Sequence, residues 1–188
     1  MLLYADLFYW RLATDGWFSV KTLEQQMAVY TAYHRNPWNR LTHFVGVPVI
    51  IFSILIPMAW LRLSLGAIEI TGAAVFVAPV LVYYYLLDIP LAIAMTAFIA
   101  PVTYFAEWVA RMPWQTGLTV FLATFVGGWA LQLVGHVLEG RRPALADNLF
   151  QIFVAPIFLV AETAFALGLR RAMQEEVNRL SHQYNSRP

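Results

Sequence analysis

Three of the four histidines in this sequence lie in two short polar segments that interrupt long apolar stretches. His34 and His43 bound the first polar segment, and His136 lies in the second together with Glu139. Neutral imidazole is a good ligand for iron, zinc or copper, and two histidines with one carboxylate leave open positions on non-haem Fe(II). His136 and Glu139 are three residues apart, which puts both side chains on one face of a helical turn. We therefore predict that these four residues hold a metal ion.

Amide side chains near the histidines are candidates for orienting the imidazole rings. Asn36 and Asn39 lie in the first polar segment, and Gln132 lies one helical turn before His136. Histidines that bind a metal almost always donate their second ring N–H to a neighbouring group, which fixes the tautomer. The competing interpretation is that the histidines are hydrogen-bonding anchors near a membrane surface and bind no metal.

Glu162 lies inside an apolar stretch and is a further candidate metal ligand or base. A carboxylate at membrane depth requires a partner, because burying an isolated charge is costly. The alternative partner is a cation, and Arg141 or Arg142 is the candidate for that ion pair. Both interpretations remain open from the sequence.

The composition is that of an integral membrane protein. Hydrophobic residues make up 60% of the 188 residues and charged residues only 12%, and the mean hydropathy is +0.61. A soluble domain carries about 25% charged residues. The chain has no cysteine, which excludes thiolate metal sites and disulfides. Its net charge is +1 and it has no basic patch with interleaved aromatic residues, so no nucleic-acid partner is indicated.

Helix-start patterns stand before and inside the first polar segment. Thr22 and Gln25 form a capping-box pattern that predicts the start of a helix. Asn36 and Pro37 end that helix and can begin the next, with asparagine at the cap and proline at the first helical position.

Four apolar stretches are close to the ~20 residues that a helix needs to cross the hydrocarbon core. They are residues 44–61, 67–87, 91–108 and 116–135. A fifth stretch, 149–168, has a proline in its middle, and we expect it to be a bent, re-entrant or interfacial segment. The predicted fold class is therefore all-α, an integral membrane helical bundle with four spans plus this bent or fifth helix.

The distribution of cations favours four full spans over five. With four spans, the end of the bundle that holds His43 also carries the basic C-terminal tail and most other cations, while the far end has only Arg62 and Arg111. The positive-inside rule makes the His43 end cytoplasmic. A five-span topology, which would move the basic tail to the other side, stays open.

We predict a single membrane domain for residues 1–188. Within it, residues 1–43 form N-terminal interfacial helices, residues 44–168 form the membrane bundle, and residues 169–188 form a polar C-terminal tail. The aromatic residues of the first 20 positions suit the headgroup region of a bilayer.

Three motifs together resemble a known family of small membrane proteins. They are Tyr33-His34-x-Asn36-x-x-Asn39-x-x-x-His43-x-x-Gly46-x-Pro48, His136-x-x-Glu139-Gly140-x-x-Pro143-Ala144-Leu145 and Phe153-x-x-Pro156-x-Phe158-x-x-x-Glu162. The resemblance covers roughly residues 20–168 and is to the 2-hydroxy fatty acid dioxygenases of bacteria, fungi and plants. The characterised fungal member of this family is an endoplasmic-reticulum enzyme of phytosphingosine breakdown.

The resemblance implies an Fe(II)-dependent dioxygenase that uses O2 to convert a 2-hydroxy fatty acid into the fatty acid one carbon shorter. It places His34, His43 and His136 at the iron, with Glu139 beside them. The implied partners are the 2-hydroxy fatty acid, O2 and membrane lipid. The implied location is a bacterial inner membrane or the endoplasmic reticulum, with the site on the cytoplasmic side; the oligomeric state is not indicated.

Arginines near the predicted site suit the carboxylate of such a substrate. Arg40, Arg141 and Arg142 are the candidates, since a guanidinium offers two parallel hydrogen bonds to a carboxylate. The alternative is that these arginines only set the topology. A non-enzymatic lipid-binding or small transport protein with interfacial histidines is the competing function. A transporter requires polar residues near the bilayer midplane, and the second to fourth apolar stretches are almost free of them.

Overall fold

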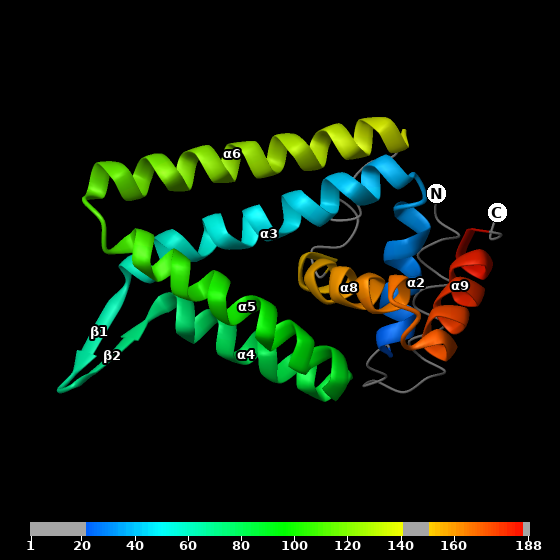
Figure 1. Cartoon of the computed structure of the whole chain (residues 1–188), viewed down its shortest axis with the longest axis horizontal. Coiled ribbons are helices and arrows are strands. Elements are labelled where there is room, and N and C mark those ends of the chain that lie inside the picture. The colour runs from blue at the N-terminus through cyan, green and yellow to red at the C-terminus, as the bar shows by residue number, and fades with distance from the viewer. Residues whose placement is uncertain (1–21, 141–150, 186–188) are drawn as a thin grey trace, which may run out of the picture.

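The computed structural model describes residues 22–140 and 151–185. The predicted interfacial segment 1–21 and the candidate substrate residues Arg141 and Arg142 lie outside the described residues. The described chain is built almost entirely of helices, whose long members run along the horizontal axis of Figure 1.

Two capped helices form the polar corner that the first motif predicts. Helix α2 (Leu23–Tyr33) begins with the full capping box, in which the Thr22 hydroxyl accepts from the Gln25 N–H and the Gln25 side chain accepts from the Thr22 N–H. Helix α3 (Pro37–Trp60) follows after a three-residue turn. Asn36 caps α3 by accepting from the backbone N–H of Trp38. The polar segment is therefore part of α3 itself, and the helix continues without a break into the apolar stretch.

The predicted second span is shorter than expected, because its first residues form a β-hairpin. Strands β1 (Arg62–Leu65) and β2 (Ile68–Thr71) pair antiparallel, and helix α4 (Gly72–Leu87) begins only after them. The prediction of one helix over 67–87 was wrong for residues 67–71. The hairpin turn contains Gly66 at a φ of +64°, a conformation that glycine adopts without strain.

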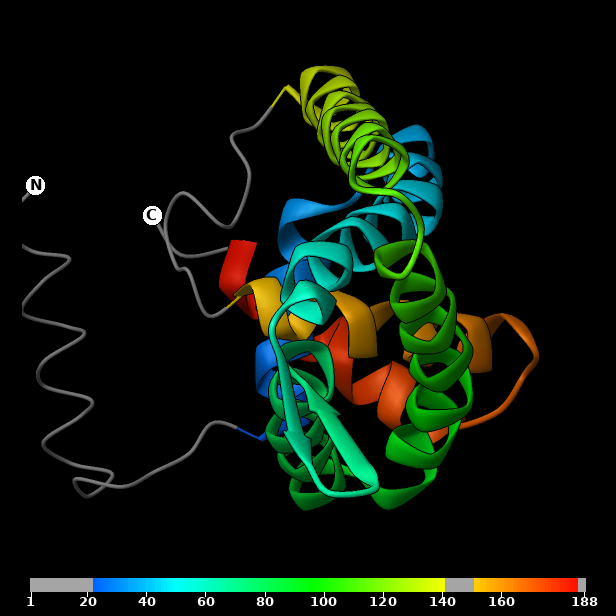
Figure 2. The ribbon, with the colours of Figure 1, turned by 90° about the vertical axis from the view of Figure 1, so that its left-hand side faces the viewer.

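Two antiparallel helix pairs make up the long body of the molecule. Helix α5 (Ile89–Ala110) packs beside α4, and helix α6 (Trp114–Glu139) packs beside α3. Seen along the bundle, α6 lies above α3 while α4 and α5 lie side by side below them (Figure 2). In Figure 1 the two pairs lie close together at the hairpin end and diverge toward the end where α2 begins.

The diverging end is covered by three further helices. Helix α8 (Gln151–Ala166) contacts α2, α3 and α5, and helix α9 (Arg171–Asn185) packs against α2. The chain bends by 120° between α8 and α9. Asp88 caps α5 by accepting from the Leu91 N–H and also forms an ion pair with Arg170 in that bend. The bend predicted for 149–168 therefore lies after Ala166, and Pro156 is accommodated within α8.

The fold class predicted from the sequence, an all-α membrane helical bundle, is confirmed. Three helices of the described chain are long and apolar enough to span a membrane: α3, α5 and α6. The bent pair α8–α9 counts as a fourth if it is taken as one span, and α4 is a shorter apolar helix. The 16 residues of α4 extend about 24 Å at 1.5 Å per residue, against a hydrocarbon core of about 30 Å.

Glycines set the close contact between α3 and α6, which bears on the position of His136. A methyl group on Gly135 would meet the side chains of Thr42 and Asn39, and one on Gly128 would lie 2.8 Å from Ile50 Cγ1. In lipid, small residues at a helix contact allow the close backbone approach that drives association. The two helices thus hold their polar ends at a fixed separation.

Candidate metal and substrate site

The three predicted histidines converge at the diverging end of the bundle, from three different helix ends. His34 caps the C-terminus of α2, His43 lies in the second turn of α3, and His136 lies in the last turn of α6. All three side chains are buried. One ring nitrogen from each lies within 4.8 Å of the others, and the described residues contain no other group of three metal-ligating side chains that meets this test.

Backbone carbonyls determine the tautomers of two of these rings. His34 Nδ1 lies 2.8 Å from the carbonyl oxygen of Tyr30, and His43 Nδ1 lies 2.8 Å from that of Asn39. A carbonyl only accepts, so each Nδ1 carries the proton and each neutral ring has a bare lone pair on Nε2. These two Nε2 atoms lie 3.1 Å apart. Two lone pairs at this distance repel each other unless a cation lies next to both.

A proton is a poor candidate for that cation. Burial, together with the neighbouring His43, lowers the pKa of His34 to about 3. Desolvation disfavours the imidazolium, so the ring is neutral at ordinary pH. A metal ion that takes one lone pair from each ring satisfies both. The donor set therefore fits a metal.

His136 completes the cluster from the opposite helix. Its ring makes edge contacts with those of His34 and His43, at centroid separations of 5.3 and 5.0 Å. Its Nδ1 is buried and has no hydrogen-bond partner within residues 22–140 and 151–185. A buried ring nitrogen without a partner is costly, and this one is available to a ligand or metal.

Tyr30 is a residue of the site that the sequence analysis did not single out. Its ring stacks on His34 with a centroid separation of 4.0 Å and an interplanar angle of 8°. Burial raises the pKa of its phenol, so the hydroxyl stays protonated. The signal in the sequence was its position four residues before His34 on the same face of α2.

Glu139 does not join the metal-ligating group. Its carboxylate accepts hydrogen bonds from the backbone N–H groups of Arg35 and Asn36, at 3.1 and 2.8 Å, and from Asn39 Nδ2 at 3.1 Å. The expectation that Glu139 is a fourth ligand is not met by this geometry. Glu139 instead joins the end of α6 to the corner between α2 and α3, which follows His34 and precedes His43 in the sequence.

The three predicted amide side chains have different surroundings. Asn36 donates from its side chain to the Leu138 carbonyl, again joining α3 to α6. Asn39 is fully buried and orients His43 through its backbone carbonyl, not through its amide. Gln132 is buried beside Gly46, and its Oε1 has no partner in the described part of the chain.

Arg40 and Glu162 form an ion pair with each other. The Glu162 side chain is 11% exposed, while that of Arg40 is 43% exposed. The ion pair that the sequence left open as one alternative for Glu162 is made with Arg40, and neither residue belongs to the histidine group. Both therefore join α8 to the start of α3.

A cavity of about 380 Å³ opens from the histidines into the bundle. Its polar end is formed by Tyr30 and the three histidines, and Gln132 lies next along α6. The remaining wall is almost wholly aliphatic and aromatic, with contributions from α3, α4, α5, α6 and α8. A volume of this size with a few polar groups at one end is typical of a small-molecule site.

The three buried histidines form a group that could hold a metal ion, and they lie at the polar end of an apolar cavity in a membrane helical bundle. Residues 20–167 match the family model described as 2-hydroxy-palmitic acid dioxygenase Mpo1-like. The chain is also 37% identical over 150 residues to the 2-hydroxy-palmitic acid dioxygenase MPO1 of Saccharomyces cerevisiae, covering 78% of this chain and 82% of the yeast protein. The protein belongs to the Mpo1-like family. No solved structure matches the chain.

Proposed function

We propose that this protein is an Fe(II)-dependent dioxygenase that converts a 2-hydroxy fatty acid into the fatty acid one carbon shorter. One substrate and one O2 give the shortened acid, CO2 and water. The observation that carries the proposal is the pair of bare Nε2 lone pairs at 3.1 Å, with the ring of His136 beside them. The family membership and the printed activity of the yeast relative supply the reaction class.

His34, His43 and His136 would hold the iron, and Glu139 would act as a positioning residue. Bound Fe(II) supplies the open positions at which O2 and the carboxylate and hydroxyl of a 2-hydroxy acid can meet. Three neutral histidines leave more positions open than a closed four-ligand site would. The backbone carbonyls of Tyr30 and Asn39 keep two of the rings turned toward the ion.

Gln132 is our candidate for recognising the 2-hydroxyl group. Its buried Oε1 lacks a partner in residues 22–140 and 151–185, and it lines the cavity one turn deeper than His136. A hydroxyl on the substrate can donate to this oxygen. A fatty acid without the hydroxyl leaves the oxygen unpaired, and such a mismatch discriminates strongly between substrates.

The site faces the cytoplasm in this proposal. Helix α9 and its preceding turn, which carry Arg170, Arg171 and Arg179, lie at the same end of the bundle as the histidines, since α9 packs against α2 (Figure 1). At the hairpin end, the two arginines 62 and 111 both pair with Glu69. The positive-inside rule then orients the histidine end inward, in a bacterial inner membrane or the endoplasmic reticulum.

The test combines metal content with turnover on one purified sample. The protein in mild detergent is loaded with Fe(II) without oxygen, then given 2-hydroxypalmitate and O2, and products are read by mass spectrometry. We expect stoichiometric iron and the acid one carbon shorter, and both should be lost in His136→Ala. Iron without product would redirect the search to other substrates. Equal absence of iron in both proteins would refute the metal site and leave a lipid-binding protein with interfacial histidines.

A further inference from the structure

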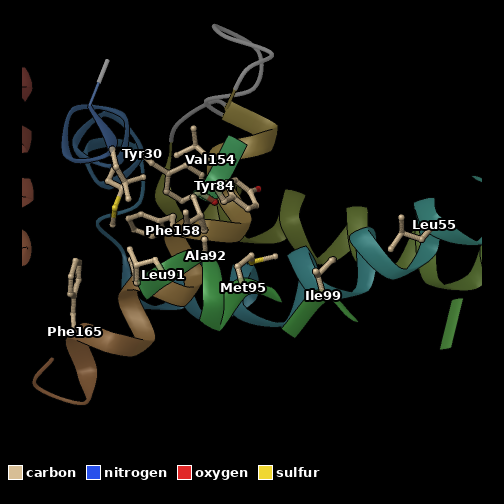
Figure 3. Close-up of a cluster of buried hydrophobic side chains, with 14 of the residues drawn as sticks. Tyr30, Leu55, Tyr84, Leu91, Ala92, Met95, Ile99, Val154, Phe158 and Phe165 are labelled. Atoms are coloured by element: carbon tan, nitrogen blue, oxygen red, sulfur yellow. The ribbon is translucent and has the colours of Figure 1, made fainter. Parts of the chain in front are cut away.

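The apolar cavity has a definite depth along the bundle. On α3 its lining runs from His43 to Leu55, which is 12 residues and about 18 Å at 1.5 Å per residue. The deepest lining residue on α5 is Ile99, and Leu55 and Ile99 are 1% and 6% exposed. Figure 3 shows Leu55 at one end of the row of buried side chains and Tyr30 and Phe158 near the other, with Met95 and Ile99 between them.

Close packing of small side chains closes the cavity beyond Leu55. Ala59 of α3, Ala73 of α4 and Ala106 of α5 have no exposed surface, and neither does Ile56. Alanines let the three helices approach closely at the hairpin end. At the other end the helix pairs diverge and α8 lies between them, which is where the cavity meets the histidines (Figure 1). The cavity therefore has a polar end at the histidines and an apolar end at Leu55 and Ile99, and part of its side is open, where the lining residues Phe76 and Leu133 are exposed.

We propose that this cavity holds one acyl chain whose carboxyl end lies at the histidines and whose methyl end abuts Leu55 and Ile99. These two residues then set the longest chain that fits. This inference rests on the proposed function, which supplies the 2-hydroxy fatty acid as substrate. It adds that acyl-chain length decides which of these acids bind. A leaflet of the hydrocarbon core is about 15 Å thick, half of about 30 Å, and this is the length of a membrane acyl chain. The depth of about 18 Å suits such a chain.

Chain-length dependence of binding follows from the shape of the cavity. Each methylene moved from water into an apolar wall contributes about fourfold in affinity. The affinity should rise by that factor with each added carbon until the chain reaches Leu55. Beyond that length the chain meets the closely packed Ile56 and Ala59 behind Leu55, and extra carbons must turn toward the open side of the cavity, where they are buried less. The affinity should then stop rising or fall.

The experiment measures binding to the full-length protein in detergent without oxygen, so that no turnover occurs, and each affinity is referred to the free acid in water by subtracting the separately measured partition of that acid into micelles. Saturated 2-hydroxy acids from decanoic to eicosanoic length displace a fluorescent fatty acid, and the affinity is plotted against chain length. Leu55→Trp should end the rise about two carbons earlier, lowering the affinity for the longest acids roughly 15-fold. Leu55→Ala and Ile99→Ala should move the end of the rise to longer acids.

The matched control is Leu122→Trp, at a side chain that is 48% exposed on α6 and lies outside the cavity lining. It should leave the wild-type profile unchanged. A wild-type profile with no end point, or an equal shift in the Leu55 and Leu122 variants, would overturn the proposal. A shifted profile in a protein that never turns over the acid would refute the dioxygenase reaction alone. Turnover with an unshifted profile would refute the chain-length role alone.

Discussion

Replacing Glu139 with glutamine separates a positioning role from direct metal binding. In the wild type one carboxylate oxygen accepts from Asn36 N and Asn39 Nδ2, and the other accepts from Arg35 N. The carbonyl oxygen of a glutamine side chain can still accept from Asn36 N and Asn39 Nδ2. Its NH2 group then faces the Arg35 N–H, and no hydrogen bond forms there because both groups are donors. The variant therefore loses one hydrogen bond, and its other two hydrogen bonds are accepted by a neutral oxygen in place of a charged one. The volume of the side chain stays nearly the same.

The magnitude follows from these contacts. A hydrogen bond to a charged group contributes about 1.5–3 kcal/mol, and partial exposure of Glu139 favours the low end of that range. Iron binding weakens about 30-fold when the whole loss of about 2 kcal/mol appears in the free energy of iron binding, through the positions of His34 and His43. Loss of a group that orients metal ligands typically costs 10–100-fold in affinity, which agrees.

Anaerobic Fe(II) titration of Glu139→Gln in detergent measures this change. We expect stoichiometric iron at saturation with the dissociation constant raised about 30-fold. The matched control is Glu175→Gln, since Glu175 is exposed on α9. If Glu139→Gln binds no iron at any concentration, as expected for His136→Ala, then Glu139 is itself a ligand and the positioning role is refuted.

Three further changes test the surroundings of the site. The Gly135→Ala variant should bind less iron and have a lower melting temperature, because the added methyl group would force α6 away from α3. Gly127→Ala is the control and should change neither, because the space around Gly127 is open. Both are checked by iron content and thermal unfolding in detergent. Arg40→Gln should destabilise the fold by about 1–2 kcal/mol by leaving Glu162 unpaired, and the double change with Glu162→Gln should cost less than the sum of the two single changes in unfolding measurements. Gln132→Leu should reduce kcat/KM for the 2-hydroxy acid and reduce the preference for binding that acid over the unhydroxylated acid, and an unchanged preference would exclude a contact with the hydroxyl.

Local chemistry in the sequence was enough to predict the helical membrane class and the corner that holds two histidines. Apolar stretches of near-spanning length require helices, because backbone groups in lipid must be paired within the chain. The capping residues Thr22 and Asn36 start α2 and α3 where the patterns indicated. The sequence did not reveal the hairpin over 62–71, since a short apolar strand and the start of an apolar helix have similar composition.

The roles of the polar residues were decided only by the tertiary structure. From the sequence we predicted that the three histidines and Glu139 lie at one end of the bundle, and we assigned all four the same role as metal ligands. In the folded chain the end of α6 approaches the corner before α3, so Glu139 meets backbone N–H groups while His136 turns toward the other imidazoles. Glu162 likewise forms its ion pair with Arg40 because α8 contacts α3 near its start. Spacing along a helix sets only the face on which a side chain lies, and its partner depends on which element packs against that face.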